Sequence, residues 1–184
     1  FITNNEYLDL IMFTIKRYLY LFINWLLNKD SQGSLSITND KHTTKNYFWC
    51  FCSTIGELNA CKTLIKEISD KYQLVLITDR QIYADSYLKH FSSAIIVTLT
   101  GNINESKHLV NKYPPKQVIV CEIPLRLHDA PCRLSFELLY KAKINGAHIS
   151  LVNGWLYQYE PACRQDALER RLFDQDYLKL FDVI

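Results

Sequence analysis

The sequence has little of what phosphate-binding and nucleic-acid-binding proteins usually need. Only 5 of its 184 residues are glycine, and neither a Gly-x-Gly-x-x-Gly pattern nor a phosphate-binding loop occurs. The formal net charge is only +2, and no dense basic patch is interleaved with aromatic residues. We therefore expect no nucleic-acid partner, and we expect the chain to be poorly equipped to hold the phosphates of a nucleotide.

Paired cysteines at metal-binding spacing are also missing. Six cysteines lie mostly within apolar segments, at positions 50, 52, 61, 121, 132 and 163, and we expect no signal peptide ahead of them. Cys50 and Cys52 form the only close pair, on one face of an expected strand, and no second pair lies at the spacing of zinc ligands. The sequence therefore predicts reduced, buried thiols, no metal site and no cofactor.

What is present describes one folded domain. Apolar residues make up 48% of the sequence and charged residues 22%, which is typical of a globular protein of this length. The sequence begins with Phe1 rather than methionine, and its last residues, "LFDVI", form an apolar run that is typical of the start of a strand. We expect the recorded chain to be part of a longer protein.

The most hydrophobic segment, residues 7–27, lacks the roughly 18 uninterrupted apolar residues that a membrane-spanning helix needs. Four polar residues interrupt it, and on a helix they fall within an arc of about 100°: Asp9, Lys16, Arg17 and Asn24. Residues 1–28 are therefore predicted to form an amphipathic, membrane-associated helix. The alternative is a helix that packs on its own domain or on a partner.

At a membrane surface, the basic and aromatic residues of this helix would have separate places. Lys16 and Arg17 are expected to reach the lipid headgroups, with Tyr18, Tyr20 and Trp25 at the boundary.

After a polar linker predicted at residues 29–46, short apolar segments alternate with amphipathic helical patterns. The apolar segments are 47–52, 73–78, 94–99, 117–121 and 147–152. This alternation predicts an α/β domain over residues 47–184, built on a Rossmann-like, doubly wound parallel sheet. Before the last segment, Asp129 and Pro131 are placed to begin a helix and Gly146 to end it.

In sheets of this kind, ligands bind beyond the carboxyl ends of the strands. Residues 53–57, 78–81, 122–124 and 153–157 are expected on that edge. Thr54 and Glu57 fit a capping box at the start of a helix, which explains them without any function. A carboxylate at the mouth of a strand, beside a glycine that leaves room for a ligand, can equally act as a general base.

Glu122 has the same two interpretations, because it follows the apolar segment 117–121 directly. It can be a solvated strand end. It can also combine with Glu57 to contact a ligand rich in hydroxyl groups.

Three segments together resemble the N-terminal half of the bacterial Kdo (deoxy-manno-octulosonic acid) transferases, which are GT-B glycosyltransferases of lipid A assembly. They are "FWCFCSTIGELNACKTLI", "VIVCEIPL" and "LVNGWLYQY". Positions that match the family's three motifs, or replace them conservatively, are Trp49, Thr54, Ile55, Gly56, Glu57, Glu122, Leu125, Asn153 and Leu156. Positions that depart from those motifs are Phe51, Pro124, Arg126 and Trp155.

The resemblance covers residues 48–184, and the hydrophobic N-terminal helix is similar to the family's membrane anchor. It implies that Glu57 is the catalytic base. It also implies that Thr54, Gly56, Glu122 and Asn153 bind the acceptor, a lipid A-type or other lipid-linked sugar. The donor, CMP-Kdo or another nucleotide-sugar, would be held by a C-terminal domain absent from this chain, without metal.

The expected location is the cytoplasmic face of the inner membrane, as a peripheral or singly anchored protein. The alternative function is a non-catalytic, membrane-associated binding or scaffold module derived from such a transferase, which the departures from the motifs favour.

Overall fold

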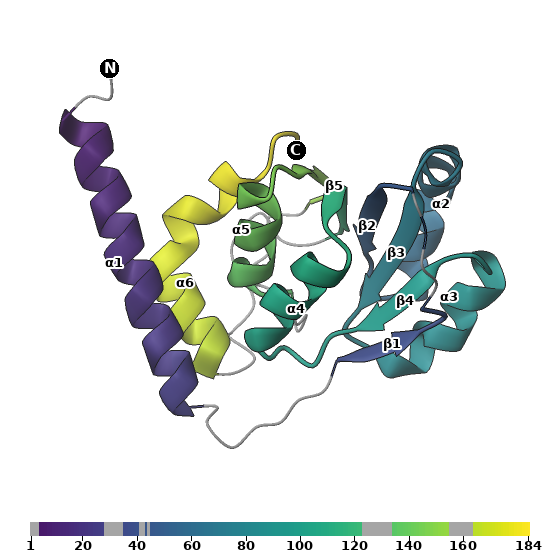
Figure 1. Ribbon diagram of the computed structural model, residues 1–184, viewed down its shortest axis with the longest axis horizontal. Coiled ribbons are helices and arrows are strands. Elements are labelled where there is room, and N and C mark those ends of the chain that lie inside the picture. The colour runs from purple at the N-terminus through teal and green to yellow at the C-terminus, as the bar shows by residue number, and fades with distance from the viewer. Residues whose placement is uncertain (1–3, 28–34, 41–42, 44, 123–133, 155–163) are drawn as a thin grey trace.

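A computed structural model describes residues 4–27, 35–40, 43, 45–122, 134–154 and 164–184. In these ranges the chain is an α/β protein with a six-stranded sheet (Figure 1). The strands are β1 (Ser36–Thr38), β2 (Tyr47–Phe51), β3 (Gln73–Thr78), β4 (Ile95–Thr98), β5 (Pro115–Cys121) and β6 (His148–Val152). The helices are α1 (Asn4–Leu27), α2 (Ile55–Ser69), α3 (Ala84–His90), α4 (Asn104–Lys112), α5 (Phe136–Ile144) and α6 (Arg164–Tyr177), with short 3-10 helices η1 (Gln81–Tyr83) and η2 (Leu178–Leu180).

The sheet is mostly parallel, and its strand order is compatible with a Rossmann-like fold. The order is β1-β4-β3-β2-β5-β6, and only β1 runs antiparallel to its neighbour. Strands β3 and β4 follow β2 on one side of the sheet, and β5 and β6 lie on the other side of β2. The point where the order reverses, between β2 and β5, is where doubly wound sheets bind their ligands. The five predicted strand segments correspond to β2 to β6.

Strand β2 is buried on both faces, because helices cover both sides of the sheet. Phe48, Cys50 and Cys52 belong to the apolar cluster beneath α2 and α3. Trp49 and Phe51 point the other way, into the cluster formed with α4, α5 and α6. The period of two along a strand divides these side chains between two cores, which explains why the sequence of β2 is continuously apolar.

Two segments add to the sheet beyond these five strands. The expected linker contributes β1, which pairs with β4 in the register Ser36 to Thr98; three residues are too few to show a strand pattern in a sequence. At the other end of the chain, the apolar run predicted as the start of a strand pairs with β6 through one parallel bridge, Ser150 to Val183. The Leu151 N–H donates to the Val183 carbonyl at 2.9 Å.

Helix α5 starts and ends with local signals. Ser135 is its N-cap, and the Ser135 hydroxyl accepts the Leu138 N–H at 3.2 Å. Asp129 and Pro131, which we expected to begin this helix, lie outside the described residues. Gly146 follows the helix with φ of +85°, the left-handed conformation that suits glycine, as predicted.

Helix α1 lies along α6 on the outside of the helical layer (Figure 1). Its polar arc faces the protein. The Arg17 guanidinium donates to both carboxylate oxygens of Glu137 on α5, at 2.6 and 2.9 Å, and Lys16 lies 3.8 Å from Asp176 on α6. The prediction that Arg17 reaches lipid headgroups was wrong, because the buried Glu137 carboxylate binds its guanidinium instead; for Lys16, whose side chain is 36% exposed, it stays a prediction.

The same inward arc holds the only two fully buried side chains of α1 among those described, Tyr20 and Asn24. Tyr20 was expected at the membrane boundary, and the structure corrects this: its ring packs edge-on against Phe173 at 5.4 Å between ring centroids. Tyr18 and Trp25, by contrast, are exposed.

The outward face of α1 is apolar and exposed. Its large exposed side chains are Leu8, Leu10, Ile11, Met12, Ile15, Tyr18, Leu19, Phe22, Trp25 and Leu26. Over the described parts of the chain, no helix combines the length and the apolar composition needed to cross a membrane. The side of the helix that contacts the protein is mixed, since Phe13, Tyr20 and Leu21 pack on the core beside the polar groups, whereas the outward side is apolar and exposed.

A buried carboxyl group joins α1, α5 and α6. Glu169 of α6 is fully buried. One of its oxygens accepts the Tyr20 hydroxyl, and the other accepts the Phe136 N–H at 3.0 Å. Burial raises the pKa of Glu169 from 4.5 to about 8, although the Phe136 N–H acts in the opposite direction.

This raised pKa makes the stability of the domain depend on pH. Between pH 4.5 and 8 the folded protein keeps a proton on Glu169 that the unfolded chain loses, so the free energy of unfolding should fall as the pH rises through this window. Glu169→Gln stays neutral and should show a flatter dependence, with its largest gain over wild type near pH 8. Urea unfolding between pH 5 and 8 measures this, and Glu67→Gln, on an exposed position of α2, is the control. Parallel pH curves for wild type and Glu169→Gln would contradict the prediction.

Candidate active site at the carboxyl edge of the sheet

Polar residues from four parallel strands meet at one edge of the sheet. Ser53 and Glu57 follow β2, Asp79 follows β3, Glu122 follows β5 and Asn153 follows β6. Parallel strands end at the same edge, so these residues come together although up to 100 positions separate them in the sequence. The group lies around the point where the strand order reverses.

The junction between β2 and α2 is a capping box, as predicted. Thr54 has extended backbone angles, φ of −133° and ψ of 163°, and its hydroxyl oxygen accepts the Glu57 N–H at 3.3 Å. The Glu57 carboxylate reaches back and accepts the Ser53 N–H at 2.5 Å and the Thr54 hydroxyl at 3.1 Å. These bonds satisfy backbone groups at the helix start that would otherwise lack partners.

Gly56 leaves open space at this junction. A Cβ added there would meet only the Thr54 hydroxyl oxygen within 4 Å, at an ordinary van der Waals distance of 3.7 Å. Packing within the described protein therefore does not require glycine here. The space is available to a ligand approaching the helix start.

Glu57 combines burial with a second carboxylate nearby. It is 7% exposed, and this burial raises its pKa; the bonds from Ser53 and Thr54 lower it in part, and the charge of Glu122 raises it again. Glu122 follows β5, the parallel neighbour of β2, so the two carboxylates belong to the same edge of the sheet. A carboxylate whose pKa is shifted toward neutrality is suited to accept a proton from a hydroxyl group.

Neighbouring elements hold the loop before α2 in place. The fully buried Tyr87 of α3 donates its hydroxyl to the carbonyls of Cys52 at 2.9 Å and Thr54 at 3.1 Å. The Ser53 hydroxyl donates to Asp79 at 2.6 Å. Asp79 belongs to a predicted edge segment, but its bond to Ser53 depends on the pairing of β2 with β3. The loop that leads into α2 and Glu57 is therefore held by neighbouring elements of the protein.

Glu122 and Asn153 adopt an unusual backbone conformation side by side. Their φ angles are +50° and +59°, and the Asn153 side-chain amide donates to the Glu122 carboxylate at 2.9 Å. Asparagine tolerates this left-handed region, whereas for glutamate it is uncommon and costs energy. Strained residues of this kind cluster at functional sites. The structure thus brings two of the predicted acceptor-binding residues into contact.

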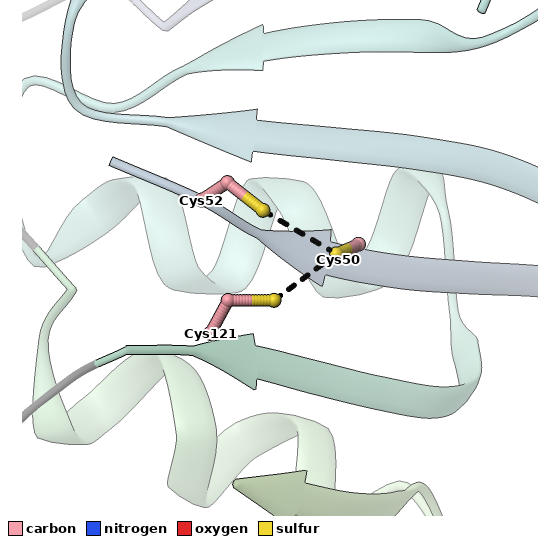
Figure 2. Close-up of side chains that lie close together, drawn as sticks. All are labelled: Cys50, Cys52 and Cys121. Carbon is pink, nitrogen blue, oxygen red and sulfur yellow. Dashed lines mark hydrogen bonds between the residues drawn. The ribbon is translucent and has the colours of Figure 1, made fainter. Parts of the chain in front are cut away.

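Beneath this edge lie buried thiols. The Cys50 sulfur is 3.6 Å from that of Cys52 and 3.7 Å from that of Cys121 on the neighbouring strand (Figure 2). Cys61 of α2 is also buried; its neighbour Cys121 and its burial raise the pKa of the Cys61 thiol. All four are free cysteines. Sequence spacing missed this cluster because Cys121 joins it through the pairing of β5 with β2.

Five positions of the three motifs lie outside the described residues: Pro124, Leu125, Arg126, Trp155 and Leu156. Phe51, which stands where the motif has histidine, points into the apolar core on the α4 and α5 side. In the comparisons with known proteins, no family model matches the chain and no curated protein matches it.

The left-handed backbone conformation at residue 122 predicts that a glutamate there lowers the stability of the protein. Glycine adopts this φ freely, whereas alanine pays roughly 1 kcal/mol, so Glu122→Gly should have a higher free energy of unfolding than Glu122→Ala by about that amount. Both variants lose the bond to Asn153, which makes alanine the matched control. Chemical unfolding measures the difference. Equal stabilities would mean that residue 122 does not hold this conformation in solution.

Proposed function

We propose that the chain is the acceptor-side half of a GT-B sugar transferase similar to the Kdo transferases. It would transfer a sugar, from CMP-Kdo or another nucleotide-sugar, to a lipid-linked acceptor. The observation that carries the proposal is the position of Glu57 and Glu122 beyond the carboxyl ends of the adjacent parallel strands β2 and β5, where the strand order reverses. The absence of a phosphate-binding loop is consistent with a donor held mainly by another domain.

In this proposal Glu57 removes the proton from the acceptor hydroxyl. The acceptor oxygen then forms a bond to the anomeric carbon of the donor sugar, while the bond from that carbon to the nucleotide's phosphate oxygen breaks. The configuration at the anomeric carbon is inverted. The bonds from Ser53 and Thr54 orient the Glu57 carboxylate and leave it further lone pairs for the acceptor proton.

Glu122 and Asn153 would bind the acceptor rather than react with it. Asn153 occupies one carboxylate oxygen of Glu122 and so orients the group, while Glu122 can accept hydrogen bonds from sugar hydroxyls. The negative charge of Glu122 also raises the pKa of Glu57, which strengthens Glu57 as a base. Thr54 and Gly56 border the same space.

Glu57→Gln separates catalysis from helix capping. Glutamine preserves the shape and can still cap, so stability should fall only slightly. It cannot take the proton, so sugar transfer should fall by about 10²-fold to 10⁴-fold. The measurements are the melting temperature and the rate of transfer from CMP-Kdo, in the full-length protein including the proposed donor-binding half.

Glu105 offers a matched control. In the first turn of α4, its buried carboxylate accepts the Thr100 N–H at 3.0 Å and the Thr100 hydroxyl at 2.5 Å, so like Glu57 it binds the loop that precedes its helix, but after β4 rather than after β2. Glu105→Gln should lose comparable stability and keep its transfer activity. If Glu57→Gln transfers sugar as well as Glu105→Gln does, Glu57 is only a cap, and the binding or scaffold alternative is favoured.

We propose further that the outward face of α1 rests on the membrane, with the protein on the cytoplasmic side of the inner membrane. Ten large apolar side chains of this helix are exposed, while its arginine is paired with Glu137. An exposed apolar stripe of this extent is typical of an interfacial helix. Since Arg17 and Lys16 contact carboxylates of the protein, attraction should come from apolar burial rather than from lipid charge.

The membrane proposal is tested by two charges placed on this face. Ile15→Asp combined with Phe22→Asp should weaken binding to phospholipid vesicles by about 100-fold, since each side chain loses at least about 1.5 kcal/mol of apolar burial. Binding of the wild type should differ little between neutral and anionic vesicles. Co-sedimentation measures both quantities.

The control carries the same two changes at exposed isoleucines elsewhere, Ile82→Asp and Ile144→Asp, which are 77% and 60% exposed. It should bind vesicles like wild type. Point changes are preferable to deletion of α1, because deletion would also uncover Glu169 and Phe173, against which Tyr20 packs. Equal vesicle binding by the Ile15/Phe22 variant and the wild type would show that this face does not contact lipid.

A further inference from the structure

Three thiols converge beneath the candidate site, from two strands that are neighbours only in the folded chain. Cys50 and Cys52 project from the same face of β2 and its continuation, and Cys121 ends β5 (Figure 2). The three sulfur atoms lie within 4.8 Å of one another, and all three residues are fully buried. A fourth thiol, that of Cys61 on α2, is 3% exposed and neighbours Cys121, but it lies outside the group of three sulfurs that are all within 4.8 Å of one another.

The spacing of the sulfurs suits a metal ion. Two thiolates bound to Zn²⁺ at about 2.3 Å in a tetrahedral site lie about 3.8 Å apart. The distances from Cys50 to Cys52 and Cys121 are 3.6 and 3.7 Å. Hence the strands already hold these sulfurs near the positions that tetrahedral coordination requires.

We propose that Cys50, Cys52 and Cys121 bind one Zn²⁺, with Cys61 as the fourth ligand. Thiolates select soft or borderline metals, above all Zn²⁺ and Cu⁺. With the same number of thiolate ligands, a Zn²⁺ site carries one negative charge fewer than a Cu⁺ site. That difference favours zinc in a buried apolar cluster with the carboxylates of Glu57 and Glu122 nearby.

The proposed ion is structural and takes no part in sugar transfer. Four protein ligands close the coordination sphere, and burial keeps substrates from reaching it. Each thiol that becomes a ligand releases one proton to solvent. The ion would join β2, β5 and α2 below the loop that leads into α2 and Glu57, so it would hold the candidate site together.

The first measurement uses the whole chain, purified under reducing conditions without chelator. Elemental analysis should find about one zinc per chain. After the metal is stripped, Co²⁺ should produce thiolate charge-transfer absorption and the visible bands of tetrahedral cobalt, and Zn²⁺ should abolish both. Zinc should also raise the melting temperature of the stripped protein. In partly unfolding concentrations of urea, mass spectrometry should show that cysteines 50, 52, 61 and 121 react with maleimide faster after stripping than before it.

Substitutions identify the ligands. Cys50→Ser and Cys121→Ser should each weaken Zn²⁺ binding by at least about 100-fold, since loss of a direct ligand should cost no less than loss of a group that orients one. Ala84→Ser places a hydroxyl in the same apolar cluster without removing a thiol, and should bind Zn²⁺ like wild type. If the cysteine variants fail to fold, the measurements on wild type still decide.

Three results would overturn the zinc site. One is reduced wild type that takes up neither Zn²⁺ nor Co²⁺, which would leave the thiols as ordinary core residues. Another is binding of Cu⁺ without Zn²⁺. The third is Cys50→Ser that binds zinc as tightly as Ala84→Ser. These measurements do not depend on sugar transfer, so they stand or fall separately from the proposed function.

Discussion

The arrangement of this protein depends on the burial of strand β2 on both faces. Helices α2 and α3 cover one face and α4 and α5 the other, so β2 lies at the centre, with β3 and β5 on either side. A parallel strand in that position must be apolar along its length, and polar groups can stand only beyond its ends. The carboxyl end of β2 is therefore where the backbone first meets solvent, and the loop to α2 carries the polar groups of the candidate site. Cys50, Cys52 and Cys121 lie just below this edge, at the ends of β2 and β5, on the face of the sheet that α2 and α3 cover.

At this edge, the Glu57 carboxylate stabilises the start of α2 and is also available for chemistry. Glu57 caps α2 through Ser53 and Thr54, and the cap fixes its position. Glu105 binds the loop after β4 in a similar way without capping α4, so a buried carboxylate in the first turn of a helix can serve the fold alone. What distinguishes Glu57 is its surroundings: a glycine with open space, a second carboxylate, and a left-handed backbone at Glu122 and Asn153. The functional proposal rests on this combination rather than on the cap.

Helix α1 packs on the domain through the side that carries its polar residues, and not through its most apolar side. The domain presents carboxyl groups from α5 and α6 at its surface, and it binds the polar arc of the helix through Arg17 and Tyr20. Pairing these partly buried groups prevents the cost of leaving charge unpaired. The outward side of the helix is apolar, while Phe13 and Tyr20 pack on the domain, and the raised pKa of the buried Glu169 predicts an attachment that is sensitive to pH.

The sequence by itself determined the alternation of strands and helices, the capping box at Thr54 and Glu57, and the glycine that follows α5. These features depend on residues within a few positions of one another, so local periodicity and backbone preference are enough to predict them. It did not predict β1, whose three residues gain their conformation only by pairing with β4. Nor did it predict the inward turn of Arg17, the bond between Glu122 and Asn153, or the meeting of Cys121 with Cys50. Only the tertiary structure decided these, because each joins elements whose proximity depends on the order of strands in the sheet or on how the helices pack against it.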